Sequence, residues 1–182
     1  MWVYIILAII VLISIYFGVT YNSFIKLKNT VEEAFSTMDV YLKKRWDLIP
    51  NIVETVKGYT KHENSTLKDV VELRNSAYDN MTANEKVDVY NKLSHGINKL
   101  MAIAEDYPDL KANENFKDLS QQLAKVEEDI ANSRKYYNGT VRNFNDKVQM
   151  FPSNIVAGML GFKERKMFEA SENERENVKV EL

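Results

Sequence analysis

The first residues of the chain constrain its fold most strongly, because they form an uncharged stretch long enough to cross a lipid bilayer. No charged residue occurs from Trp2 to Tyr21. A helix of about 20 residues, at a rise of 1.5 Å each, is roughly 30 Å long and matches the hydrocarbon core of a bilayer. Trp2 and Tyr4 lie near one end and Tyr16 and Tyr21 near the other, as interfacial aromatic residues do. Residues 1–22 are therefore predicted to be an uncleaved transmembrane anchor.

Two other interpretations of this stretch fit the sequence less well. A cleaved signal peptide has a basic start and a small-residue cleavage site, and neither feature is present here. A buried helix of a soluble protein would need a large core around it. Lys26 and Lys28 follow the stretch and no Lys or Arg precedes it, which favours a cytoplasmic location for the rest of the chain.

The remainder of the chain, roughly 160 residues, is long enough for one domain with a sizeable core. We assign residues 23–170 to this domain and residues 171–182 to a charged tail that is predicted to be disordered. The net charge is −2, with acidic and basic residues interspersed, so no basic patch indicates nucleic-acid binding. The sequence contains no cysteine, which excludes disulfides, thiol catalysis and cysteine-based metal sites.

Pro50 lies within a pattern that otherwise predicts one long amphipathic helix. Apolar residues recur at alternating steps of three and four on both sides of it, so the heptad-like phase is the same before and after the proline. This favours a single kinked helix that ends between Gly58 and His62. The alternative is a break, with Pro50 at the first position of a new helix. The seam consists of Phe24, Leu27, Val31, Ala34 or Phe35, Met38, Leu42, Ile49, Ile52, Val56 and Tyr59.

Three further amphipathic helices follow, and no stretch alternates with the two-residue period of a strand. Thr82 and Glu85 form a capping-box pattern at the start of the second of these helices. Pro108 and Pro152 mark helix ends, because proline disfavours a helical conformation in the residue before it. The predicted ranges are about Ser65–Met81, Thr82 to the residues before Tyr107, and Asn115–Phe151.

These patterns predict an all-α fold, with an N-terminal transmembrane helix followed by an elongated up-down-up-down four-helix bundle. The first helix beyond the membrane and the last helix each have about 36 residues, or roughly 54 Å. Their equal length predicts an antiparallel pair, with Phe24 and Phe151 at one end and Tyr59 and Phe116 at the other.

The sequence carries no recognisable catalytic, cofactor-binding or metal-binding motif. His62 and His95 are the only histidines, and neither has a second histidine one turn away, so both are expected on the surface. Glycine-rich phosphate loops and nucleophile-elbow patterns are also absent. We therefore expect no enzymatic activity, no cofactor and no metal ion.

The first long helix carries two candidate sites, the single residue Arg45 and a stripe of four polar residues. Arg45 is the only polar residue on the seam, and an unpaired buried charge is costly, so we expect a structural ion pair. The alternative is that its head group extends to water. Its candidate partners are Glu127, Glu128 and Asp129, with Asp39 as a local alternative. The second group shares one outward stripe, which is either a solvated face or a partner-binding surface: Lys44, Asp47, Asn51 and Glu54.

The segment "FPSNIVAGMLGFKERKMFEA" combines apolar residues with a basic cluster. Such a combination is typical of a helix that lies in the membrane interface, where apolar side chains enter the headgroup boundary and cations attract anionic lipid. The alternative is that the segment caps the open end of the bundle near Phe24 and Leu27. The candidate interfacial residues are Ile155, Val156, Met159, Leu160, Phe162, Lys163, Arg165 and Lys166.

Four blocks, in order and at the expected spacing, resemble the LemA family. They are the N-terminal span, "VEEAFSTMDVYLKKRWDLIPNIVETVKGYTKHE", "AEDYPDLKANENFKDL" and "FPSNIVAGMLGF". The resemblance implies a membrane-attached helical bundle without an established biochemical activity. Some members of the family look like lipoproteins with a lipidated cysteine, which implies a bundle outside the cytoplasm. This sequence has no cysteine there, so the side of the membrane stays open.

The anchor, the elongated bundle and the lack of catalytic motifs together favour a single-pass, non-enzymatic scaffold or interaction module at the cell membrane. Its expected partners are the lipid bilayer and another membrane or envelope protein, with no nucleic acid. The alternative function is a peripheral lipid-binding or membrane-remodelling module that acts through residues 152–168.

Overall fold

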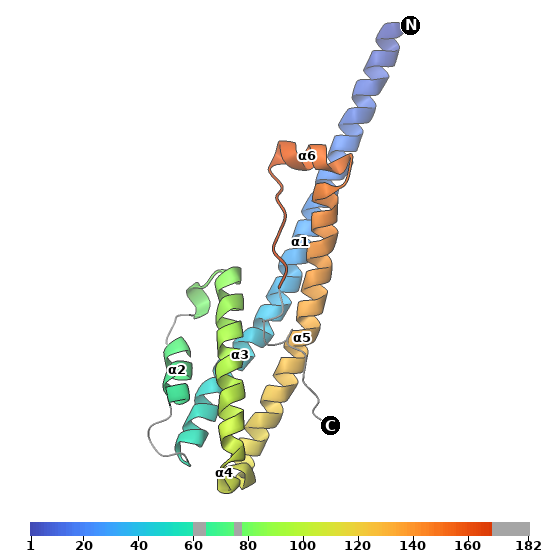
Figure 1. The fold of residues 1–182 in the computed structure, drawn as a ribbon. Coiled ribbons are helices and arrows are strands. Elements are labelled where there is room, and N and C mark those ends of the chain that lie inside the picture. The colour runs from blue at the N-terminus through green and yellow to red at the C-terminus, as the bar shows by residue number, and fades with distance from the viewer. Residues whose placement is uncertain (60–64, 75–77, 169–182) are drawn as a thin grey trace, which may run out of the picture. The chain divides into compact units, whose positions relative to one another are not determined.

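The computed structural model describes residues 1–59, 65–74 and 78–168, and these residues form helices, turns and extended segments without any strand. The all-α prediction is confirmed for this part of the chain (Figure 1). The predicted tail, residues 171–182, and His62 lie outside the described residues. The elements are α1 (Trp2–Lys57), α2 (Ser65–Arg74), the 3-10 helix η1 (Tyr78–Asn80), α3 (Ala83–Glu105), α4 (Pro108–Ala112), α5 (Glu114–Gln149) and α6 (Ser153–Leu160).

The prediction that the chain continues as one helix through Pro50 is confirmed, because α1 runs without interruption from Trp2 to Lys57. A proline removes one backbone hydrogen bond and crowds the carbonyl four residues earlier, that of Trp46. Ile49, Ile52 and the other seam residues around it are buried, so their packing holds the helix together across the missing bond.

The described chain divides into two compact units, and α1 and α5 each contribute to both. The terminal unit consists of residues 1–36 and 134–168, and the central unit consists of residues 37–133.

In the terminal unit, α1 and the last part of α5 pack antiparallel, and α6 lies across them (Figure 1). Phe24 is at the centre of the core, where its ring stacks on Phe162 at 4.7 Å and meets Phe144 edge-on at 6.2 Å. Such aromatic pairs add to the stabilisation from burial alone. The buried residues of this core are Phe24, Val31, Val141, Phe144, Val156 and Ala157.

An extended segment, residues 162–168, returns along α5, and we call it the strap. The side chain of Asn145 exchanges two hydrogen bonds of 2.8 Å with the backbone of Arg165, and Asn138 does the same with Phe168 at 2.8 and 2.7 Å. The spacing explains the match: seven helical residues rise about 10.5 Å, and three extended residues span about 10 Å. Two asparagines two turns apart therefore hold a strap that runs antiparallel to α5.

In the central unit, the predicted capping box at the start of α3 is confirmed. Thr82 accepts a hydrogen bond from the backbone of Glu85, and the Glu85 carboxylate accepts one from the backbone of Thr82 at 2.7 Å. The prediction for α2 was too long: the helix ends at Arg74, residues 75–77 lie outside the described part, and η1 follows. α2 packs closely on α3, because a Cβ added at Gly96 would lie 2.6 Å from Cγ2 of Val70.

The short helix α4 was not predicted, although the end of α3 before Tyr107 was. Pro108 occupies the first position of α4, where its missing N–H has no helical acceptor to lose. Leu110 from this single turn is fully buried.

The antiparallel pairing of α1 with α5 is found within each unit. In the terminal unit Phe24 contacts Phe144, two turns before Phe151. In the central unit Asn113, next to the start of α5, donates a 2.9 Å hydrogen bond to the hydroxyl of Tyr59. Both contacts agree with the predicted pairing of helix ends.

Candidate functional site

Arg45 lies at the centre of a buried polar network in the central unit. Its side chain is only 3% exposed, and its Nε is 2.6 Å from a carboxylate oxygen of Glu127. That N–H is poorly aligned for a hydrogen bond, so the contact is an ion pair. The guanidinium also donates to the hydroxyl of Ser94 at 2.9 Å and lies 4.5 Å from the ring centroid of Tyr90. Tyr90 in turn donates to Glu127 at 3.0 Å.

The environment of Arg45 is structural. Burial lowers the pKa of Arg45, and the nearby Glu127 carboxylate opposes this shift. Arginine nevertheless stays protonated in proteins, so Arg45 keeps its positive charge inside the core. The adjoining cavity measures about 10 Å³, which is room for at most one water and none for a substrate. Of the predicted partners, the structure selects Glu127.

Asp39, the local alternative for Arg45, has different partners. Its carboxylate accepts hydrogen bonds of 2.7 Å from Lys86 and from the hydroxyl of Tyr78. The ammonium of Lys86 also lies 4.6 Å from the ring centroid of Tyr78, and Tyr78 packs against Trp46. This cluster joins η1 and the start of α3 to α1. The sequence did not indicate that Tyr78 and Lys86 would share Asp39 as a partner, because the three residues lie on different elements and their contacts follow no common period.

The outward stripe of α1 lies on the surface of the central unit. All four of its residues, Lys44, Asp47, Asn51 and Glu54, are exposed. Asp47 pairs with Lys43 at 2.6 Å and Glu54 with Lys57 at 3.0 Å, which are local contacts one turn apart. Exposed pairs of this kind contribute little to stability, and an open helix face does not exclude water from a reaction. The stripe therefore remains a candidate surface for a partner.

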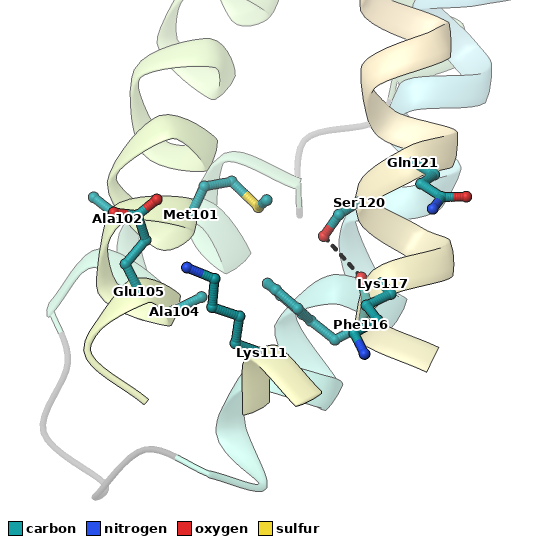
Figure 2. A pocket seen from close by; sticks show the side chains of 9 residues that line it. All are labelled: Met101, Ala102, Ala104, Glu105, Lys111, Phe116, Lys117, Ser120 and Gln121. Atoms are coloured by element: carbon teal, nitrogen blue, oxygen red, sulfur yellow. Dashed lines mark hydrogen bonds between the residues drawn. The ribbon is translucent and has the colours of Figure 1, made fainter. Parts of the chain in front are cut away.

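A pocket of about 560 Å³ opens between the end of α3 and the start of α5 in the central unit (Figure 2). Met101, Ala104 and Phe116 give it an apolar lining, and Lys111 extends into it in Figure 2. The hydroxyl of Ser120 is already used, since it donates to the carbonyl of Phe116 at 2.7 Å. The charged groups at its rim come from Glu105, Lys111 and Lys117. It consists of Met101, Ala102, Ala104, Glu105, Lys111, Phe116, Lys117, Ser120 and Gln121.

α6 divides the predicted interfacial residues into two sets. Val156 is buried in the core of the terminal unit and Phe162 packs on Phe24, so these two residues follow the alternative of a cap near Phe24 and not that of an interfacial contact. They cap the core because α6 lies across it. The opposite face is uncovered, with Ile155 55% and Met159 72% exposed. Leu160 is also exposed, as are two residues just before α6, Met150 and Phe151.

The basic residues near α6 are also divided. Lys163 and Lys166 are exposed, whereas Arg165 pairs with Glu32 at 3.1 Å and lies over the ring of Phe144. The hydroxyl of Tyr137 donates to the carbonyl of Lys166, and burial raises the pKa of Tyr137. The terminal unit as a whole carries nine Lys and Arg against four Asp and Glu, although the whole chain has a net charge of −2.

Within the described residues, no cluster of three or more His, Asp or Glu side chains is arranged to hold a metal ion. His95 is exposed on α3. One described helix, α1, is long and apolar enough to cross a membrane, and its apolar stretch is almost entirely uncovered by the rest of the protein.

Comparison with known proteins identifies the family. The model of the LemA family matches residues 34–182. The chain belongs to the LemA family. It is 27% identical over 158 residues to protein LemA of Metamycoplasma hominis, an alignment that covers 86% of this chain and 72% of the relative.

More distant relatives carry a different name. This LemA-family chain is 21% identical over 175 residues to magnetosome protein MamQ 2 of Paramagnetospirillum magneticum, covering 82% of the chain and 64% of the relative. A magnetosome protein MamQ of Magnetospirillum gryphiswaldense is 21% identical over 174 residues, with coverage of 81% and 64%. The chain thus spans somewhat less than two thirds of the length of these magnetosome proteins. The family match and the apolar part of α1 together indicate a membrane-associated protein of the LemA type.

Proposed function

We propose that this LemA-family protein is a non-enzymatic interaction module, held at the cell membrane by the first part of α1 as a single span. Its partner is another membrane or envelope protein. In this proposal its helices form an elongated up-down-up-down four-helix bundle, supported by the antiparallel pairing of α1 with α5 within each unit and by the packing of α2 on α3.

The observation that carries the proposal is the uncovered apolar surface of α1. The stretch from Trp2 to Tyr21 has no charge and is exposed throughout Trp2 to Tyr16, and it continues without a break into a helix that packs in both units. An exposed apolar surface of this extent is unfavourable in water, which supports its placement in a bilayer. The buried polar side chains, such as Arg45, bond to other residues of the protein, so we assign them a role in stability and not in a reaction.

A site-specific crosslinking experiment tests the interaction role. A photoreactive amino acid is placed in the full-length protein at Asn51 on the outward stripe, at Gln121 beside the pocket, or at the exposed control position Asn143 in the terminal unit. We expect illumination of native membranes to give one discrete adduct from position 51 or 121 and none from 143. Equal or absent adducts at all three positions, in protein that is correctly inserted, would contradict the proposal.

The second candidate function is a peripheral module that binds or remodels lipid through residues 152–168. The uncovered apolar face of α6 favours it. In this second function the bilayer is the ligand on which the protein acts, and not only the medium that anchors it. Reconstituted full-length protein would then change the size distribution of vesicles in proportion to its density, whereas an anchored interaction module leaves the vesicles unchanged.

A further inference from the structure

We infer that the exposed residues around α6 form a second membrane contact, seated in the headgroup boundary of the leaflet where the span of α1 ends. The residues are Met150, Phe151, Ile155, Met159 and Leu160, and we call them the α6 face. This inference rests on the proposed function, since it takes the first part of α1 to lie in a bilayer.

The register of the two long helices sets the level of the α6 face along α1. The ammonium of Lys147 donates a 2.6 Å hydrogen bond to the hydroxyl of Ser23. Because α5 runs antiparallel to α1, the residues that follow Lys147 lie beside those that precede Ser23. α5 ends at Gln149, two residues or about 3 Å beyond Lys147, which places the end of the helix near the level of Tyr21. Tyr21 ends the uncharged stretch, and Phe151, which is 80% exposed, follows the end of α5 by two residues.

α6 itself packs against the last turns of that stretch. Val156 and Ala157 share a core with Phe24, and Phe17 packs against the same cluster. Thr20, between them on α1, is buried as well. Figure 1 shows α6 crossing the direction of α1 within the terminal unit. A helix that crosses a membrane span at its end lies roughly in the plane of the interface, as interfacial amphipathic helices do.

A bilayer of ordinary thickness extends along α1 to the level at which α6 packs. The wholly uncovered part of α1, from Trp2 to Tyr16, is about 22 Å long, which is too short for a hydrocarbon core of roughly 30 Å. The span reaches that length only if it extends to about Tyr21. The bilayer then includes the level at which α6 packs, and the α6 face meets lipid.

The charge distribution supports the same occupant. The terminal unit has an excess of five positive charges, and Lys26 and Lys163 are exposed just beyond the uncharged stretch, whereas Lys166 lies farther along the strap, where its carbonyl meets Tyr137. Cations placed just outside the apolar layer attract anionic headgroups within about a Debye length. An anionic lipid surface favours apolar residues at the headgroup boundary with cations on the water side of them. The α6 face is also continuous with the apolar surface of α1, which the proposed function places in lipid.

The absence of cysteine makes a direct test possible, because each single cysteine gives one labelling position. Four full-length variants carry a fluorescent NBD label: Ile155→Cys and Met159→Cys on the α6 face, Val11→Cys in the middle of the span, and Asn29→Cys on an exposed position of α1. Each is reconstituted at one chain per nanodisc, in phosphatidylcholine with or without phosphatidylglycerol. Quenching is compared between lipids with a shallow and a deep doxyl group.

We expect shallow quenching at 155 and 159, deep quenching at 11 and little at 29. Adding phosphatidylglycerol increases quenching at 159, and Lys26→Gln with Lys163→Gln removes that increase. If labels 155 and 159 behave like label 29 while label 11 is quenched, the second contact is wrong and the anchor stands. If label 11 is also unquenched, the anchor itself fails and the proposed function with it. If the labels at 155 and 159 are shielded from water only when a nanodisc holds two or more chains, the α6 face is a self-association surface and the inference is wrong.

Discussion

The Arg45–Glu127 pair makes an asymmetric prediction, because the two side chains differ in their access to water. Arg45 is almost fully buried, whereas the Glu127 side chain is 35% exposed. Glu127→Gln keeps the shape and leaves an uncompensated cation in the core. Breaking a buried pair from one side costs about 3–5 kcal/mol, and partial solvent access at Glu127 reduces this to about 2–3 kcal/mol.

The reverse change is expected to be mild. Arg45→Met fills most of the same volume and leaves a carboxylate that water reaches and that still accepts a hydrogen bond from Tyr90. We expect a cost of about 1 kcal/mol or less. In the double variant the glutamine oxygen can still accept from Tyr90, and Ser94 keeps its own bond to the Tyr90 carbonyl. The double variant should therefore be more stable than Glu127→Gln alone.

Urea unfolding of the full-length protein in detergent, followed by the fluorescence of Trp46, measures these differences. Trp46 is buried in the central unit, and Trp2→Phe makes it the sole tryptophan. A loss of 2–3 kcal/mol lowers the urea midpoint by roughly 1–2 M at ordinary slopes. If Glu127→Gln is neutral, or if Arg45→Met costs as much as Glu127→Gln, the argument from unequal burial is refuted.

Three further predictions follow from other contacts. Gly96→Ala should destabilise the central unit by about 1–2 kcal/mol, because its Cβ would meet Val70 at 2.6 Å, whereas Gly139→Ala, which has open space around it, should stabilise α5 by about 0.5–1 kcal/mol in the same urea assay. Asn145→Ala removes both bonds to Arg165 and should speed hydrogen exchange in the strap, whereas the exposed control Asn143→Ala should not. Hydrogen bonds from the Thr82 backbone and hydroxyl lower the pKa of Glu85 in the folded state. Its contribution is therefore present above the pKa of the unfolded chain and is lost as pH falls through the folded value. The destabilisation by Glu85→Gln, measured as a change in Tm, should shrink between neutral pH and about pH 3.

The long helices were predictable because their packing leaves a periodic trace in the sequence. The seam of α1 keeps its phase across Pro50, so continuity could be inferred from position alone. The antiparallel register of the two long helices also limited the candidate partners of Arg45 on α5 to three neighbouring residues, Glu127, Glu128 and Asp129. It could not identify Tyr90 or Ser94, because the rotation of α3 about its own axis depends on what α2 and α1 leave uncovered. α4 was missed because a single turn is too short to show a period, although Pro108 at its first position is a recognised start signal.

The strap shows a different limit. Its contacts join amide side chains of a helix to the backbone of an extended segment, and such contacts impose no periodicity on either partner. The only trace in the sequence is a pair of asparagines, Asn138 and Asn145, seven residues apart on a helix, where asparagine is otherwise unfavourable. The prediction for residues 152–168 offered an interfacial helix or a cap. The structure shows that one face of α6 serves the core and the other is left open.

The distribution of charge also becomes visible only in the folded chain. Read along the sequence, acidic and basic residues alternate, and the net charge of −2 gives no reason to expect attraction to anionic lipid. The antiparallel return of α5 ends beside the apolar stretch, and the terminal unit carries an excess of five positive charges while the remaining residues carry an excess of seven negative charges. Electrostatic attraction to a membrane falls off within about 10 Å at ordinary salt, so the exposed cations nearest the end of the apolar stretch, Lys26 and Lys163, decide it and the net charge of the chain does not. The dependence of the α6 face on phosphatidylglycerol should therefore weaken with added salt, as for a basic protein, even though the chain as a whole is acidic.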